Sequence, residues 1–149
     1  MKNAVPNVIR KIKFKYGDET LFFIQENVAF SFNADACLCI TIENIEKECI
    51  AECSYSIYNR KECFLTFIEV NLPTYIKKGI GTTLLKFVEC DARRRGCTYM
   101  SGHFEPFDQY ADYAKDFYIR NNYSFKKEKN DKFTRLYKEL KPKQPTYDR

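Results

Sequence analysis

The sequence predicts an α+β fold in which a mostly antiparallel central sheet is flanked by few helices. Residues 8–71 contain five segments rich in alternating, aromatic or β-branched residues, separated by polar turns. Apolar residues recur at helical spacing from residue 79 onward. A strand, a second helix and two short strands then follow, without an internal repeat. We therefore expect a single domain over residues 1–140, followed by a disordered tail over 141–149.

The N-terminal segments are expected to form an antiparallel meander, because short turns join consecutive strands. Gly17-Asp18 and Asn33-Ala34-Asp35 are the clearest turn signals. The expected strands are residues 8–16, 20–32 (one long strand or a bent pair), 36–42, 49–58 and 63–71.

Two helices are expected in the second half. The first begins at Gly79 and ends at Arg93-Arg94-Arg95-Gly96, where cations meet the negative end of the helix dipole and a glycine stops the helix. Residues 97–104 read as a strand, and Pro106 opens the second helix. Asn121-Asn122 can close that helix, because Asn tolerates the left-handed conformation. The last two strands are expected over residues 123–127 and 133–140.

Composition excludes several classes of protein. The chain is 44% hydrophobic, which is too apolar for a disordered protein. It has no run of about 18 apolar residues and no apolar signal-peptide segment near Met1, so a soluble cytoplasmic protein is expected. Its seven cysteines form no CxxC pair and its one histidine, His103, has no partner at zinc spacing. We expect reduced thiols and no metal site.

The charge is concentrated in the second half of the chain. Residues 63–149 carry 17 Lys and Arg against 11 Asp and Glu, whereas residues 1–62 carry 8 against 9. A basic half suits a polyanionic ligand, either a nucleotide cofactor or a nucleic acid. The charge alone does not choose between these two ligands.

The most informative segment joins an apolar strand to the first helix. It runs from Glu69 through Pro73 to Leu85 and contains Lys77-Lys78-Gly79-Ile80-Gly81-Thr82. Glycines in a first helical turn allow unpaired backbone N–H groups to approach a ligand, at the positive end of the helix dipole. A pyrophosphate is the ligand that suits such a site. The spacing fits neither the Walker motif nor the Rossmann fingerprint, and a plain strand–helix connection remains the alternative from the glycines alone.

The wider pattern resembles the GNAT superfamily of acyl-CoA N-acyltransferases. Pro73-Thr74-Tyr75, Gly79-Ile80-Gly81 and Leu84-Leu85 match the family's cofactor motif in order and spacing. The segment from Ala114 through Phe117-Tyr118 to Tyr123 matches a second family motif. The resemblance covers residues 36–140. It implies a sheet with a splayed strand pair, in a chain whose strand-rich N-terminus lacks the two helices that the family usually has there.

The resemblance also implies a cofactor and its contacts. Acetyl-CoA or another acyl-CoA would bind as co-substrate, with its pyrophosphate on the amides of Lys77, Lys78, Gly79, Ile80, Gly81 and Thr82. Its pantetheine arm would lie along the strand edge at Val70 and Asn71, and Tyr118 would protonate the departing thiolate. The chain departs from the family pattern at three residues, where it has Ile76, Ala111 and Asn122.

Acyl transfer to an amine also requires a group that takes up the amine proton. Glu69 is the candidate base, because strand alternation is expected to put it on one face with Leu65 and Phe67, where partial burial would raise its pKa. Simple solvation of Glu69 is the alternative. His103 and Glu105 are candidates for contact with the substrate, at the end of the next strand.

The acceptor amine, a small molecule or a protein, is left open, and so is a homodimer. A non-catalytic CoA-binding protein and a nucleic-acid-associated protein are the alternatives to an enzyme. No membrane partner is expected.

Overall fold

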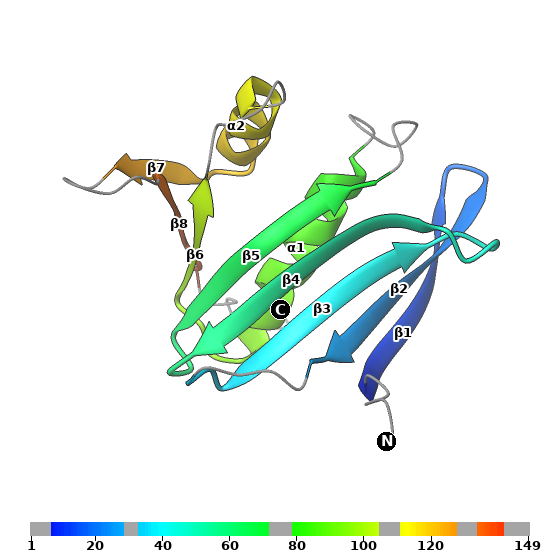
Figure 1. Cartoon of the computed structure of the whole chain (residues 1–149), viewed down its shortest axis with the longest axis horizontal. Helices are drawn as coiled ribbons and strands as arrows, with labels where there is room; N and C mark the ends of the chain where they lie inside the picture. The colour runs from blue at the N-terminus through cyan, green and yellow to red at the C-terminus, as the bar shows by residue number, and fades with distance from the viewer. Residues whose placement is uncertain (1–6, 29–32, 72–78, 105–110, 128–133, 142–149) are drawn as a thin grey trace, which may run out of the picture.

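A computed structural model describes residues 7–28, 33–71, 79–104, 111–127 and 134–141, and these residues form one eight-stranded sheet with two helices (Figure 1). The strands lie in the order β1-β2-β3-β4-β5-β6-β8-β7. The elements in chain order are β1 (Asn7–Tyr16), β2 (Glu19–Asn27), β3 (Ala36–Glu43), β4 (Cys49–Tyr58), β5 (Glu62–Val70), α1 (Ile80–Arg94), β6 (Tyr99–Phe104), α2 (Ala111–Arg120), β7 (Ser124–Lys127) and β8 (Thr134–Glu139).

The predicted antiparallel meander is confirmed for β1 to β5, each of which pairs with the next strand along the chain. Strand β2 ends at Asn27, and the predicted continuation over residues 29–32 lies outside the described residues. Strand β6 begins at Tyr99, two residues later than predicted. Residues 7–27 form two strands and no helix, as the sequence predicted.

The core lies between one face of the meander and α1. Alternate residues of each strand point to this face, as period-2 alternation requires. Leu38, Ile40 and Ile42 of β3 and Leu84, Leu85 of α1 are fully buried there. Helix α1 lies behind strands β3 to β5 in the view of Figure 1, and no described helix lies over the near face of the sheet.

The ends of both helices depend on residues with positive φ. Gly96, with φ of 90°, ends α1, and the backbone N–H of Cys97 donates to the carbonyl of Ala92 at 2.9 Å. Asn122, with φ of 69°, ends α2 in the same way, and Tyr123 N–H donates to the carbonyl of Tyr118 at 2.9 Å. Both are the hydrogen bond from the residue after the left-handed position to the carbonyl five residues earlier, as in a Schellman motif. The predicted helix closures are therefore confirmed.

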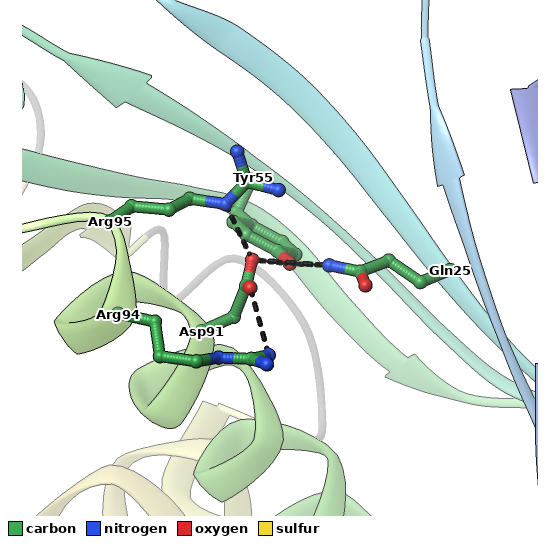
Figure 2. Close-up of polar contacts among 5 residues, drawn as sticks. All are labelled: Gln25, Tyr55, Asp91, Arg94 and Arg95. Carbon is green, nitrogen blue, oxygen red and sulfur yellow. Dashed lines mark hydrogen bonds and ion pairs between the residues drawn. The ribbon is translucent and has the colours of Figure 1, made fainter. Parts of the chain in front are cut away.

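A buried polar cluster fixes the C-terminal part of α1 against the sheet (Figure 2). The Asp91 carboxylate is 4% exposed and accepts hydrogen bonds from Tyr55 Oη at 2.7 Å and Gln25 Nε2 at 3.1 Å. Arg95 Nε and Arg94 donate to the same carboxylate at 2.9 and 3.1 Å. A buried charge is tolerated only when it is paired and hydrogen-bonded. The donors to the Asp91 carboxylate come from β2, from β4 and from the C-terminal end of α1.

A second buried carboxylate joins α1 to the other half of the sheet. Glu89 accepts hydrogen bonds from Tyr123 Oη at 2.8 Å and from Lys138 Nζ, of β8, at 2.9 Å. Burial and then the Glu89 carboxylate raise the pKa of Tyr123 above its ordinary value. All seven cysteines are free thiols, as predicted, and Cys53, Cys63 and Cys97 are buried.

Candidate active site

The sheet opens between β5 and β6, which confirms the predicted splayed pair. These two strands are parallel neighbours only over Glu62–Leu65 and Tyr99–Gly102. Beyond that point they diverge, toward the end of the sheet that carries α2 (Figure 1). A Cβ on Gly102 would lie 3.1 Å from the Leu65 carbonyl oxygen, a tight contact, so this close approach of the two strands favours glycine. The edge of β5 from Thr66 to Val70 has no partner strand on the β6 side among the described residues.

A β-bulge lies where the strands separate. Tyr55 pairs with Leu65 and Ser54 pairs with Phe67, so Thr66 is the additional residue. The bulge reverses the alternation of β5: Leu65, Ile68 and Val70 face the core, whereas Phe67 and Glu69 face away from it. The prediction that Leu65 shares a face with Glu69 is therefore wrong. The expected partial burial of Glu69 is also wrong, because its side chain is exposed opposite Glu52.

Helix α1 begins beside the open end of β5. Gly79 is the N-cap with φ of 84°, and among the described residues no side chain caps the helix by accepting a hydrogen bond from its first N–H groups. Thr83 N–H donates to the Gly79 carbonyl, so the amides of Ile80, Gly81 and Thr82 precede the first helical bond and have no partner within the helix. No acidic side chain lies in this turn. These amides therefore suit an anionic group such as a phosphate.

Gly81 has a packing role that the sequence reading missed. A Cβ on Gly81 would lie 3.1 Å from Phe117 Cε1 and 3.8 Å from Val70 Cγ2. The Phe117 ring of α2 therefore packs directly against the Cα of Gly81, close to the end of β5. The sequence suggested that both glycines allow a ligand to approach the backbone. In the structure Gly81 allows α1 and α2 to pack closely, and Gly79 provides the left-handed N-cap.

Asn121 is a second residue that the sequence reading missed. Its Nδ2 donates to the Phe117 carbonyl at 2.8 Å and to Thr82 Oγ1 at 3.4 Å. The C-terminal end of α2 is thereby attached to the first turn of α1. Four predicted residues, Val70, Gly81, Thr82 and Tyr118, consequently lie around one junction of β5, α1 and α2.

Tyr118 has a buried ring and a hydroxyl that no described residue hydrogen-bonds. The side chain is 9% exposed and packs edge-on against Phe104, Phe125 and Tyr123. Burial raises the pKa of Tyr118 to about 12, and the nearby Cys53 thiol contributes to this shift. The phenol is therefore protonated throughout the neutral range and can donate a hydrogen bond or a proton.

The opposite face of the sheet carries the other predicted side chains. His103 of β6 is exposed and its ring lies 5.2 Å from that of Phe64 of β5, edge to face. Phe64, Phe67 and Glu69 share this face of β5, because the additional residue Thr66 shifts the alternation by one position after Leu65. Glu69 and His103 thus border the splay on one face, whereas Phe104 and Tyr118 border it on the other. Lys77, Lys78 and Glu105 lie outside the described residues.

A comparison of the sequence with known protein families identifies the family of this chain. Residues 9–123 match the acetyltransferase (GNAT) family. The chain belongs to the GNAT acetyltransferase family. The match includes the N-terminal strands, so the strand-rich start is part of this GNAT domain. A comparison with curated protein sequences found no significant match.

Solved structures show the same GNAT fold at low sequence identity. An acetyltransferase from Bacillus cereus is 19% identical, with 70% of this chain and 73% of that chain covered and a TM-score of 0.58. An acetyltransferase of the GNAT family from Staphylococcus aureus is 16% identical, with 70% and 69% covered and a TM-score of 0.59. Ard1 from Thermoplasma volcanium is 13% identical, with 68% and 70% covered and a TM-score of 0.56.

Two further observations bear on partners. In the described part of the GNAT chain, no helix has the length and apolar character needed to cross a membrane. Many of the aromatic rings lie in the core, among them Phe23, Tyr55, Phe104, Tyr118 and Tyr123. Stacking on single-stranded nucleic acid requires exposed rings, so these side chains do not serve that purpose.

Proposed function

We propose that this GNAT protein is an N-acetyltransferase that moves an acetyl group from acetyl-CoA directly to an amine. The observation that carries the proposal is the junction of the splayed β5 edge, the first turn of α1, which has no side-chain cap among the described residues, and the Tyr118 hydroxyl, which no described residue hydrogen-bonds. Family membership supports acyl transfer in general. Acetyl-CoA as the donor and the role of each residue are the finer part of the proposal.

The donor side is the face that carries α1 and α2. The amides of Ile80, Gly81 and Thr82 suit the pyrophosphate of acetyl-CoA, because they have no partner within the helix and lie at the positive end of the helix dipole. Lys77 and Lys78 belong to the same proposed loop. The open edge of β5 that ends at Val70 and Asn71 suits the amide groups of the pantetheine arm, which can bond to the backbone groups on the β6 side; the Asn71 N–H itself donates to the Ile50 carbonyl on the β4 side.

Tyr118 is proposed as the general acid. In the transfer, the amine nitrogen forms a bond to the thioester carbon, the carbon–sulfur bond breaks, and the sulfur leaves with the electron pair. The Tyr118 hydroxyl donates to that sulfur. With a pKa of about 12, the phenol keeps its proton until negative charge develops on the sulfur, so it acts mainly in the transition state.

Glu69 is proposed to receive the amine proton from the opposite side of the splay. Its exposure means that the proton passes to a solvated carboxylate, directly or through water. His103 borders the same opening and, with Glu105, is proposed to contact the acceptor. The acceptor amine would thus approach from the face opposite to the helices, while the acyl donor lies on the helical face.

The test compares Tyr118→Phe with the parent protein. Turnover of acetyl-CoA should fall by about 10²-fold or more, since general acids contribute about 10²- to 10⁴-fold, while acetyl-CoA affinity measured by calorimetry stays within about twofold. Tyr137→Phe on β8 is the matched control and should leave both quantities unchanged. Equal turnover of Tyr118→Phe and the parent would refute the assignment. Loss of acetyl-CoA binding would instead assign Tyr118 to packing.

A further inference from the structure

The face of the sheet opposite α1 changes the sign of its charge across the splay between β5 and β6. We call it the outward face, and the register assigns side chains to it, because residues opposite each other on neighbouring strands point to the same side. Glu52 of β4 and Glu69 of β5 lie on one side of the splay. Arg135 of β8 and Lys126 of β7 lie on the other side, in one cross-strand row with His103. The strands that carry the two groups flank the opening in Figure 1.

Each side of the opening holds two like charges directly opposite each other. Glu52 and Glu69, which we call the acidic pair, face each other in the register of β4 and β5. Arg135 and Lys126, which we call the basic pair, face each other in the register of β8 and β7. Like charges in this position are unfavourable. The salt bridges of the described residues involve none of the four side chains. A ligand that carries both signs of charge would relieve both repulsions at once.

The other charged side chains that the strands carry on the outward face lie farther from the opening. Glu62 and Glu139 lie on either side of Tyr99, at the end of the sheet where β5 and β6 are still paired. The remaining ones belong to β1, β2 and β3: Lys11, Lys13, Lys15, Glu26 and Glu43. The acidic pair and the basic pair are therefore the charges of this face that a ligand in the opening meets first.

The spacing of the two pairs sets the length of such a ligand. The last pair of β5 and β6 is Leu65 with Gly102. Glu69 lies four residues farther along β5, whereas Arg135 faces His103, the next residue of β6. The two backbones are thus offset by about three residues along the strands and by two strands across them, about 10 Å in each direction and about 14 Å in all. Both side chains are exposed, so the ligand spans only part of this distance. A chain of about five carbon atoms, which separates its two end groups by about 8 Å, fits this requirement.

We propose that the acceptor is a zwitterion of this length, with the amine that receives the acetyl group at one end and an anionic group, a carboxylate or a phosphate, at the other. The inference rests on the proposed function, because it places the amine beside Glu69. The acidic pair attracts the amine in its ammonium form. Arg135 binds the anionic group, since a guanidinium can donate two parallel hydrogen bonds to a carboxylate or a phosphate. Lys126 adds a second positive charge beside it.

The first test uses acceptors with the same chain and different end groups: 6-aminohexanoate, hexylamine and 1,6-diaminohexane. The kcat/KM for 6-aminohexanoate should exceed that for hexylamine by about tenfold or more, because only the former gains charge-assisted hydrogen bonds. The diamine should be the poorest acceptor, because its second ammonium meets the basic pair. A fourth acceptor, 6-aminohexyl phosphate, shows which anionic group is preferred. Acetylation of hexylamine or the diamine as efficiently as both anionic acceptors overturns the inference and leaves the proposed function standing.

The second test assigns the anionic end to Arg135. Arg135→Gln removes the charge and keeps a polar side chain, and it should reduce the preference for 6-aminohexanoate over hexylamine to about twofold or less. Lys13→Gln is the matched control, because it removes one positive charge from the same face on the distant strand β1. This variant should keep the full preference. A preference that survives in Arg135→Gln, or that is lost equally in both variants, contradicts the assignment.

Direct binding separates this inference from the proposed function. The binding of 6-aminohexanoate and of hexylamine to the full chain is followed by NMR titration with CoA present, so that no transfer can occur. The dissociation constant of 6-aminohexanoate should be lower by about tenfold or more, and the amides of β5 and β8 near Glu69 and Arg135 should shift. This binding preference without turnover of any acceptor would count against the proposed function alone. Equal binding of the two compounds would refute the zwitterionic acceptor, even in a protein that transfers acetyl groups.

Discussion

Replacing Asp91 with alanine tests how α1 is fixed to the sheet. The Asp91 carboxylate accepts hydrogen bonds from Gln25, Tyr55, Arg94 and Arg95 (Figure 2). Removing it takes an acceptor from all four donors, although the Gln25 amide keeps its second hydrogen bond, to Tyr55 Oη at 2.8 Å. The cost depends on which of these donors can turn to water.

The two donors from the sheet cannot reach water, whereas the two arginines can. Tyr55 and Gln25 are 0% and 2% exposed, and an unsatisfied buried donor costs about 1–3 kcal/mol. The Arg94 and Arg95 side chains are 55% and 32% exposed, so their lost ion pairs add little. Alanine recovers about 0.5 kcal/mol of helix propensity. The expected loss in the free energy of unfolding is therefore about 2–4 kcal/mol.

Urea unfolding followed by circular dichroism measures this loss, and two variants control it. Tyr55→Phe removes one donor to Asp91 and one of the two acceptors of Gln25 Nε2, but it leaves Asp91 bonded by three donors and Gln25 bonded to Asp91, so it should cost about 1 kcal/mol. The triple variant Gln25→Leu, Tyr55→Phe, Asp91→Leu removes the stranded polar groups and should be more stable than Asp91→Ala. If Asp91→Ala costs no more than Tyr55→Phe, the reasoning about buried donors is refuted.

Two other predictions concern the site itself. The pKa of Tyr118 is about 12 in the folded protein and about 10 in the unfolded chain, so its contribution to stability is complete below pH 10 and is lost as pH rises toward 12. Between pH 9 and pH 11 Tyr118→Phe should lose about 1.4 kcal/mol less stability to urea than the parent, and parallel losses would contradict this. Gly79 has a φ of 84° and open space around its Cα, so Gly79→Ala should cost about 1 kcal/mol through backbone strain alone. Gly79→Asn, measured in the same urea titration, should cost less, because Asn tolerates the left-handed region; the reverse order would exclude strain as the cause.

Local sequence signals were sufficient for most of the fold. Period-2 alternation and turn residues predicted β1 to β5, and helical spacing with a terminal glycine predicted α1. The Asn122 helix end was predictable because few residue types tolerate positive φ. The splayed strand pair was predicted through the resemblance to GNAT proteins, since no local pattern in β5 or β6 encodes it.

What the sequence did not reveal depends on contacts between distant segments. The bulge at Thr66 adds one residue to β5 without a local signal, and it moves Glu69 away from the face of Leu65. The fit of Phe117 against Gly81 joins residues from two helices. In the sequence, Asp91 is one more polar residue near a helix end. Only the packed structure shows that Tyr55 and Gln25 donate hydrogen bonds to its carboxylate. In each case tertiary packing, rather than local preference, decides the outcome.

The most direct measurement of the central claim follows acetyl transfer itself. The purified chain is incubated with acetyl-CoA and a panel of amines: a polyamine, an amino sugar, an amino acid and a lysine-containing peptide. Free thiol release is recorded, and mass spectrometry follows the amines. An N-acetyltransferase should release thiol and acetylate at least one amine in equal amounts, while Tyr118→Phe releases thiol about 10²-fold or more slowly. An absence of acetyl-CoA binding by calorimetry, together with no thiol release from any amine, would contradict the proposed function.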